Sequence, residues 1–173
     1  MGASGLEEYI RDIADYPKDG VIFRDITPLL GDGGAFARTV DGLVDHWVGM
    51  KVDRVIGIEA RGFILAAPVA YRLGAGFVPV RKAGKLPWAV AREEYSLEYG
   101  TDKLEIHRDA LGPDEQVLII DDVLATGGTA AATARLVEGL GAEVVGLGFV
   151  IELSALGGRD RLAGHQIQSL LTY

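Results

Sequence analysis

Short apolar runs alternate with stretches of helical periodicity along most of the chain. Four unbroken apolar runs are typical of strands buried on both faces of a parallel sheet: Arg54–Ile58, Gly76–Val80, Val117–Ile120 and Val144–Ile151. Helical spacing separates them at 36–47, 63–73 and 130–140, and Gly74 and Gly141 follow the last two stretches. This alternation predicts an α/β fold: an open, mostly parallel twisted sheet with helices on both faces.

The N-terminal region does not follow this alternation. Leu6, Ile10 and Ile13 repeat at helical spacing and predict a short helix that ends before Pro17. An extended run follows, and its backbone groups are free to bond a ligand. We therefore expect residues 1–32 to form a small hood over the sheet.

A second irregular region lies between the apolar runs. No periodicity holds from Leu86 to about Glu94, which predicts a flexible loop. Tyr95–Gly100 and the alternating Leu104–His107 follow and predict strands that form the stem of this loop. Residues 82–107 are thus expected to be a flexible loop with its flanking strands, and another strand is expected near Gln166–Leu171.

Composition narrows the class of protein. The 173 residues predict one domain, 1–173, and the formal net charge of −8 argues against nucleic acid as a partner. The chain contains no Cys, which excludes disulfides and thiolate chemistry. Neither a signal-like N-terminal segment nor an apolar run long enough to span a membrane is present. We therefore expect a cytoplasmic protein with no membrane partner.

The strongest candidate chemistry follows the run Val117–Ile120. Asp121 and Asp122 stand at its carboxyl end, where open α/β sheets bind ligands, and two adjacent carboxylates need donors such as ribose hydroxyls or a metal. Ala125–Thr129, the phosphate loop hereafter, is rich in glycine and threonine and leads directly into a helix, as phosphate cradles do. Together they predict a site for a ribose 5-phosphate. The alternative is a capped strand-turn-helix with a solvated acidic pair.

Cations stand after two other predicted strands. Arg61 follows the first strand beside a glycine, and Arg81, Lys82 and Lys85 follow the second. Such residues suit pyrophosphate recognition. The alternatives are a surface ion pair for Arg61 and a solvated face for the charge run.

Five segments then carry a resemblance to a known family. They occur in the order seen in the adenine phosphoribosyltransferases, members of the type I phosphoribosyltransferase family that use phosphoribosyl pyrophosphate (PRPP): Val21–Pro28, Glu59–Phe63, Arg81–Pro87, Tyr95–Gly100 and Val117–Thr129. The resemblance covers almost the whole chain. It implies the type I phosphoribosyltransferase fold and the reaction of adenine with PRPP to give AMP and pyrophosphate in purine salvage, with Mg²⁺ held mainly by PRPP, in a homodimer.

The resemblance also implies residue roles. The PRPP-binding residues would be Asp121, Asp122, Ala125, Thr126, Gly127, Gly128 and Thr129. The pyrophosphate-binding residues would be Ala60, Arg61, Arg81, Lys82 and Lys85, and the Glu59–Ala60 peptide would be cis. Ile22, Phe23, Arg24 and Val123 would bind adenine, with Phe23 and Val123 on the two faces of the purine. Glu98 would be the catalytic acid/base, and the loop at 86–94 would open to release product.

Two features separate this interpretation from its rivals, and a third is a departure from the family pattern. Backbone carbonyls at Ile22–Arg24 suit a 6-amino group and disfavour a 6-oxopurine. Ala125 begins the sequence Ala-Thr-Gly, where family members that act on 6-oxopurines resemble Asp-Thr-Gly. Ala83 stands where some relatives carry another Arg. The rivals are a related enzyme that acts on xanthine, hypoxanthine or orotate, and a regulator that senses PRPP without transferring it. From the residues alone, a place in the core is favoured for Phe23 over contact with a ligand.

Overall fold

The structure, a computed structural model, describes residues 5–97 and 100–173. The elements follow one another as η1 (Glu7–Tyr9), β1 (Arg11–Ala14), β2 (Ile22–Asp25), α1 (Thr27–Gly31), α2 (Gly33–Asp45), β3 (Arg54–Ile58), α3 (Arg61–Leu73), β4 (Gly76–Lys82), β5 (Val90–Ser96), β6 (Thr101–His107), β7 (Gln116–Leu124), α4 (Gly128–Gly139), β8 (Glu143–Glu152), η2 (Ser154–Leu156), α5 (Gly158–Arg161) and β9 (Ile167–Thr172). Among these residues no helix is long and apolar enough to cross a membrane.

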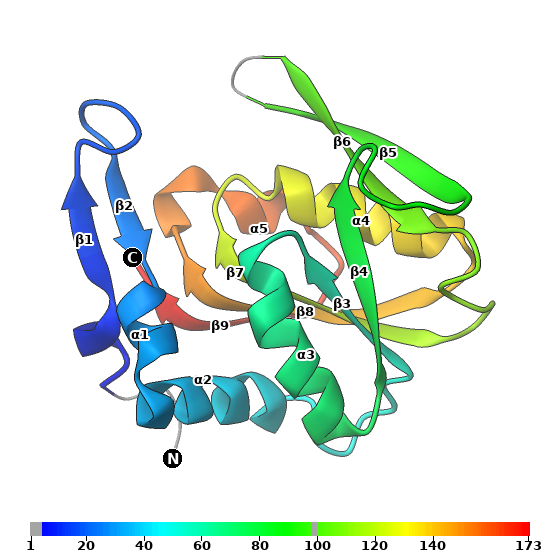
Figure 1. Ribbon diagram of the computed structural model, residues 1–173, viewed down its shortest axis with the longest axis horizontal. Coiled ribbons are helices and arrows are strands. Elements are labelled where there is room, and N and C mark those ends of the chain that lie inside the picture. Colours follow the sequence, from blue (N-terminus) through cyan, green and yellow to red (C-terminus); the bar gives the residue numbers. More distant parts are fainter. Residues whose placement is uncertain (1–4, 98–99) are drawn as a thin grey trace.

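The central sheet has seven strands in the order β5-β6-β4-β3-β7-β8-β9 (Figure 1). The five strands from β4 to β9 in this order pair in parallel, whereas β6 is antiparallel to β4 and β5 is antiparallel to β6. The expected mostly parallel sheet is confirmed. The chain passes from β3 to β4 on one side and from β7 to β8 on the other. The carboxyl ends of β3 and β7 therefore flank the point where the strand order reverses, which is where such sheets bind ligands.

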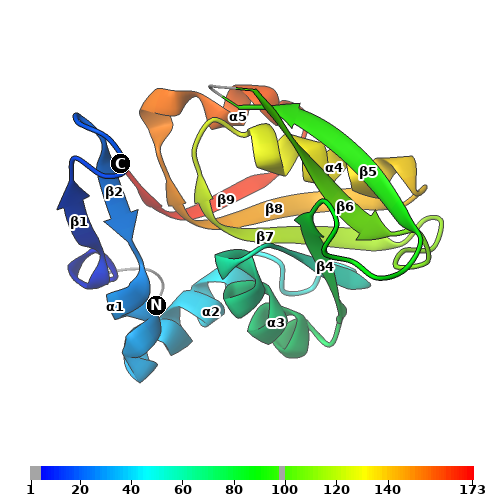
Figure 2. The ribbon, with the colours of Figure 1, turned by 45° about the horizontal axis from the view of Figure 1, so that its top comes forward.

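Side chains of the central strands alternate between two buried cores. Ile56 and Ile119 pack in one core with the apolar face of α4, while Val55 and Leu118 pack in the other core with α2 and α3. Figures 1 and 2 show α4 on one face of the sheet and α2 and α3 on the opposite face. Because both faces are covered, adjacent residues of a strand are all apolar, and the amino-acid pattern shows no alternation.

The predicted N-terminal helix is wrong. Only Glu7–Tyr9 form a helical turn, and β1 then pairs antiparallel with β2 in a separate two-stranded sheet, at the left of Figure 1. The turn between the strands is held by the Gly20 N–H, which donates to Asp15 Oδ1 at 2.7 Å. Leu6 is fully buried and enters the core, but pairing with β2 overrides the helical spacing of the residues after it.

The predicted loop at 86–94 is shorter in the structure. Val90–Ser96 form β5, which pairs along its whole length with β6, from Val90 opposite His107 to Ser96 opposite Thr101. This segment forms a strand because its backbone pairs with β6, although its own side chains are mostly polar. The resulting β5–β6 hairpin packs against α4 and rises beside the carboxyl edge of the sheet (Figure 2).

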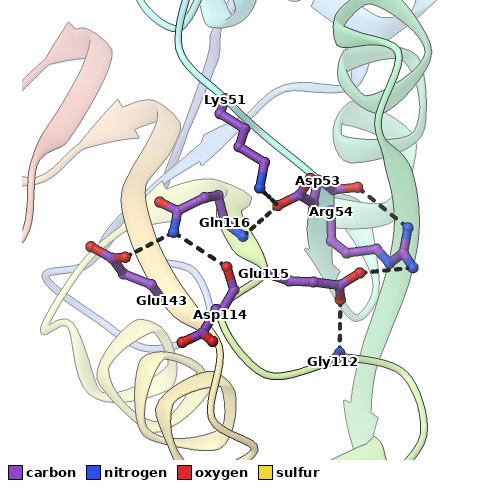
Figure 3. Close-up of polar contacts among 8 residues, drawn as sticks. All are labelled: Lys51, Asp53, Arg54, Gly112, Asp114, Glu115, Gln116 and Glu143. Atoms are coloured by element: carbon purple, nitrogen blue, oxygen red, sulfur yellow. Dashed lines mark hydrogen bonds and ion pairs between the residues drawn. The ribbon is translucent and has the colours of Figure 1, made fainter.

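Ion pairs and side-chain caps hold the amino edge of the sheet, at the end opposite the acidic pair (Figure 3). The Gln116 N–H donates to Asp53 Oδ2 at 2.8 Å and links β7 to the start of β3. Arg54 lies 3.0 Å from Glu115 Oε1, and the Gly112 N–H donates to the other Glu115 oxygen at 2.8 Å. These contacts fix the turn before the central strand.

Candidate active site at the carboxyl edge of the sheet

The two acidic residues lie inside β7, which continues four residues beyond the apolar run. Asp122 is buried, and Arg61 Nε donates to its Oδ2 atom. The Asp122 N–H donates to Asp121 Oδ1 at 2.9 Å. Burial, together with the neighbouring Asp122 carboxylate, raises the pKa of Asp121 well above its usual range. Hydroxyl donors from a ligand would relieve this crowding of acceptor oxygens.

Gly62 lets helix α3 approach the acidic pair closely. A Cβ atom on this residue would lie 2.8 Å from Asp121 Oδ1 and 3.2 Å from the Ile120 carbonyl oxygen. The Glu59–Ala60 peptide just before it is cis, as the resemblance implied. The turn from β3 into α3 therefore lies directly against the carboxyl end of β7 and places Arg61 on Asp122.

A cavity of about 510 Å³ opens between these elements. Six of the predicted site residues line it: Ala60, Arg61, Lys82, Asp121, Asp122 and Thr129. They come from the ends of β3, β4 and β7 and from the starts of α3 and α4. The structure thus brings the acidic pair, two cations and the phosphate loop to one hollow, as expected for parallel strands whose carboxyl ends meet at one edge.

The phosphate loop encloses a smaller hollow of about 80 Å³. All five of its residues line this hollow, and Asp121 and Thr129 also belong to the larger cavity. Gly127 adopts a left-handed conformation with φ of 79° and caps the start of α4. The unpaired N–H groups of a helix start carry partial positive charge, so this hollow can hold an anionic group beside the larger cavity.

The cations at the carboxyl end of β4, Arg81 and Lys82 within the strand and Lys85 after it, are arranged unequally. Arg81 donates to both Glu59 oxygens, at 3.2 and 3.3 Å, and Lys82 Nζ lies 3.3 Å from Asp102. Burial acts to raise the pKa of Glu59, but the Lys82 N–H and the Arg81 guanidinium outweigh it and hold that pKa below its usual range. Among the described residues, neither Arg81 nor Lys85 lines the larger cavity. Only Lys82 of this group does so.

Tyr95 is a site residue that the sequence interpretation missed, having treated it as part of a loop stem. It is 8% exposed, lines the larger cavity, and its hydroxyl lies 3.3 Å from Asp102 Oδ2. The hydroxyl also interacts with the Thr129 side chain, although burial is the main influence and raises the Tyr95 pKa. The β5–β6 hairpin therefore touches the phosphate loop through this ring. A single tyrosine in a polar strand gives no sequence signal for such a role.

The predicted base-binding residues lie at the hood. The Arg61 guanidinium carbon is 5.5 Å from the centre of the Phe23 ring, which also makes an edge contact with Tyr16. Phe23 therefore lies beside Arg61, is partly exposed and is not in the core. Ile22 is exposed, and Arg24 pairs with Asp12. Val123 lines the small hollow beside the phosphate loop.

The predicted catalytic residue, Glu98, lies outside the described residues. Leu97 and Gly100 are the nearest described residues on its two sides, and the Leu97 N–H donates to the Gly100 carbonyl oxygen at 2.9 Å. Leu97 also borders a hollow of about 290 Å³ with Thr126 and Thr129 of the phosphate loop. Within residues 5–97 and 100–173, no cluster of three or more metal-ligating side chains occurs.

Comparison with known proteins agrees with this geometry. The family described as the phosphoribosyl transferase domain matches residues 32–163. An adenine phosphoribosyltransferase of Solibacter usitatus is 60% identical over 168 residues, which cover 97% of each chain. Another, of Desulfitobacterium hafniense, is 54% identical over the full length of both chains.

Solved structures show the same relationship in three dimensions. The adenine phosphoribosyltransferase of Thermoanaerobacter pseudethanolicus superposes with a TM-score of 0.96 at 50% identity and covers 99% of both chains. The enzyme of Saccharomyces cerevisiae, solved with adenine and an imino-altritol bisphosphate, superposes with a TM-score of 0.92 at 38% identity and covers 97% of both chains. The chain therefore belongs to the phosphoribosyltransferase family and, within it, to the group formed by the adenine phosphoribosyltransferases.

Proposed function

We propose that this protein is an enzyme of purine salvage that transfers the 5-phosphoribosyl group of PRPP to adenine, giving AMP and pyrophosphate. The observation that carries the proposal is the cavity of about 510 Å³, in which the acidic pair, Arg61, Lys82 and Thr129 meet. The shared group membership and the adenine in the yeast relative support the same substrate.

In this proposal the sugar phosphate lies across the two hollows. Its 5′-phosphate occupies the hollow of the phosphate loop, and its ribose hydroxyls donate to Asp121 and Asp122. Arg61 and Lys82 face the larger cavity and hold the pyrophosphate. Ala60 contributes its backbone, while Arg81 and Lys85 approach the pyrophosphate from the edge of the site.

Adenine would bind between the hood and β7. Phe23 and Val123 cover the two faces of the purine, and the backbone of Ile22–Arg24 reads its 6-amino edge. Strand β2 pairs only with β1 in the described part of the chain, so the backbone groups on its other edge are available. Carbonyl acceptors favour the 6-amino group of adenine and leave a 6-oxo group facing an acceptor.

The chemistry is a displacement at C1′ of the ribose. The bond from C1′ to the pyrophosphate oxygen breaks ahead of formation of the bond to the adenine nitrogen, and the nitrogen's proton passes to Glu98. Fixed cations stabilise the charge that develops on the leaving group. We propose that the β5–β6 hairpin excludes water from this step and opens for product release.

Magnesium carried by PRPP would neutralise part of the pyrophosphate charge. The residues present fit such an ion, because the carboxylates of Asp121 and Asp122 line the cavity and oxygen ligands suit Mg²⁺. Asp121 and Asp122 would orient the ribose hydroxyls around it.

The test is formation of AMP and pyrophosphate from adenine and PRPP, with and without Mg²⁺. We expect turnover with adenine, little with hypoxanthine, and a loss of about 10²- to 10⁴-fold in kcat for Glu98→Gln. Equal rates with adenine and hypoxanthine would contradict the role of Ile22–Arg24. Unchanged turnover in Glu98→Gln would contradict the acid/base assignment.

We also propose a cytoplasmic homodimer. Ile64 and Tyr71 on α3 and Phe77 on β4 are exposed apolar side chains, and exposed apolar surface is a feature of interfaces. Sedimentation of the purified chain tests the dimer, and fractionation of the producing cell tests the location.

A further inference from the structure

The turn Gly157–Gly158 packs directly against the back of the phosphate loop. A Cβ atom on Gly127 would lie 2.6 Å from the Gly158 carbonyl oxygen, and one on Gly158 would lie 2.4 Å from the Ala125 carbonyl oxygen. The two backbones are thus in contact without intervening side chains. Any displacement of this turn would move the loop or leave it unsupported.

An ion pair between a buried carboxylate and a half-exposed guanidinium holds this turn in place. Arg159 follows the turn directly and donates to both carboxylate oxygens of Glu152, at 2.6 and 2.7 Å. Ser169 on β9 adds a third hydrogen bond to Glu152, at 2.8 Å. Glu152 is 6% exposed, and the bond from Arg159 holds its pKa below the usual range.

The anchor lies beside the strand from which the loop departs. Glu152 pairs in register with Leu124, the last residue of β7, and the Leu153 N–H donates to the Leu124 carbonyl at 2.9 Å. The phosphate loop is therefore fixed at its start by β8 and supported from behind by the turn that Arg159 ties to β8. Both supports meet at the end of β8, one at Glu152 and the other at Leu153, the residue that follows the strand.

We propose that Glu152 and Arg159 are positioning residues for the transfer reaction, which hold the phosphate loop in its binding conformation through the Gly157–Gly158 turn. The inference rests on the proposed function for the identity of the ligand. Neither side chain contacts the hollow of the loop, so their effect is on the affinity for the sugar phosphate and not on the chemistry at C1′.

Calorimetric titration of PRPP into the full chain tests the proposal without reliance on turnover. We expect Arg159→Gln to raise the Kd for PRPP by about ten- to hundredfold. The reason is that even a small displacement of the phosphate loop misplaces the groups that bind the ligand. Arg159→Lys keeps the charge but loses the two-pronged geometry and should fall between the parent and Arg159→Gln. The KM for adenine should stay within about twofold of the parent, because adenine is proposed to bind between the hood and β7. A twofold change is about 0.4 kcal/mol, at 1.4 kcal/mol for each tenfold.

The matched control is Arg54→Gln, which breaks the Arg54–Glu115 pair at the opposite edge of the sheet (Figure 3). It should lower the melting temperature and leave the Kd for PRPP unchanged. If Arg159→Gln proves unstable, Ser169→Ala removes one hydrogen bond of the anchor and should give a smaller rise in Kd.

A double-mutant cycle with Glu152→Gln separates positioning from general stability. The effects of the two substitutions on the Kd for PRPP should not add. The double variant should have a Kd no higher than that of the single variant that binds PRPP more weakly. An unchanged Kd in folded Arg159→Gln, or parallel changes for PRPP and adenine, would overturn the proposal. A parent that binds PRPP but forms no AMP would instead contradict the proposed function.

Discussion

The carboxyl group of Asp121 holds its proton more tightly in the folded chain than in the unfolded one, because it is buried beside Asp122. A carboxyl group with a raised folded pKa contributes stability at pH values below its unfolded pKa, near 3.8, and this contribution is lost as pH rises through the folded pKa. Above its unfolded pKa, the Asp121 carboxyl group therefore makes the folded chain less stable than it is at low pH.

Asp121→Asn should be more stable than the parent at neutral pH and should bind PRPP more weakly, because the amide presents one acceptor oxygen fewer to the ribose. Melting temperatures of both chains between pH 3.5 and about 8 check this, and the difference should grow as pH rises. A constant difference across the range would contradict the assignment. PRPP affinity is measured on the same samples.

Tyr95 links the β5–β6 hairpin to the phosphate loop. Tyr95→Phe removes the hydroxyl that reaches Asp102 and Thr129 and keeps the buried ring. We expect the KM for PRPP to rise by about two- to tenfold, the equivalent of one net hydrogen bond. Tyr9→Phe is the control, since Tyr9 lies in the turn Glu7–Tyr9 and lines neither hollow of the site. A KM equal to that of the parent would show that the hairpin acts without this hydroxyl.

At the scale of elements, strands covered on both faces could be predicted closely. The run Arg54–Ile58 is the observed β3, and α3 ends at Leu73 with Gly74 in the left-handed conformation, as its glycine indicated. Such elements carry their own signal, because their side chains are buried by helices that the same sequence pattern predicts.

The elements that could not be predicted depend on partners distant in sequence. Val90–Ser96 became a strand because β6 supplies its hydrogen bonds, and Arg11–Ala14 became one because of β2. Both strands are partly exposed and polar on much of their surface, so the pattern of apolar residues carries no information about them.

The turn that follows helix α2 packs on β8 at a residue without a side chain. A Cβ atom on Gly146 would lie 2.1 Å from the Trp47 ring, and Trp47 is fully buried. We expect Gly146→Ala to lower the free energy of unfolding by about 1–3 kcal/mol, the cost of overpacking a core. Urea denaturation measures it. The control is Gly139→Ala, because a Cβ atom added at Gly139 would have no packing neighbour within 4 Å. This substitution should be neutral or slightly stabilising.

At the scale of the whole molecule, several carboxylates are held as anions by nearby donors. Glu59, Glu105 and Glu152 have pKa values below their usual 4.5 in the folded chain. A depressed folded pKa contributes stability above the unfolded pKa, and this contribution is lost as pH falls through the folded value. The melting temperature should therefore fall steeply below pH 4.5, and high salt should reduce the slope. A melting temperature that stays level down to pH 3 would contradict this.

The site could be predicted where it is continuous in sequence and only in part where it is assembled in space. The acidic pair and the phosphate loop form one run, and both line the expected hollows. Tyr95 and the Gly157–Arg159 support come from segments 30 residues away on either side, and only the fold brings them to Thr129 and Gly127. No local pattern reports such contacts.

The β1–β2 hairpin is a sheet of its own, joined to the rest of the molecule by side-chain contacts such as that of Arg24 with Tyr173. Its residues can therefore be exchanged without altering the register of any central strand. If the hood binds the base as proposed, a different hairpin grafted at residues 11–25 would retarget the protein to another nucleobase, provided that the graft keeps an aromatic ring beside Arg61. The proposed arrangement thus places the choice of base on a small unit outside the central sheet.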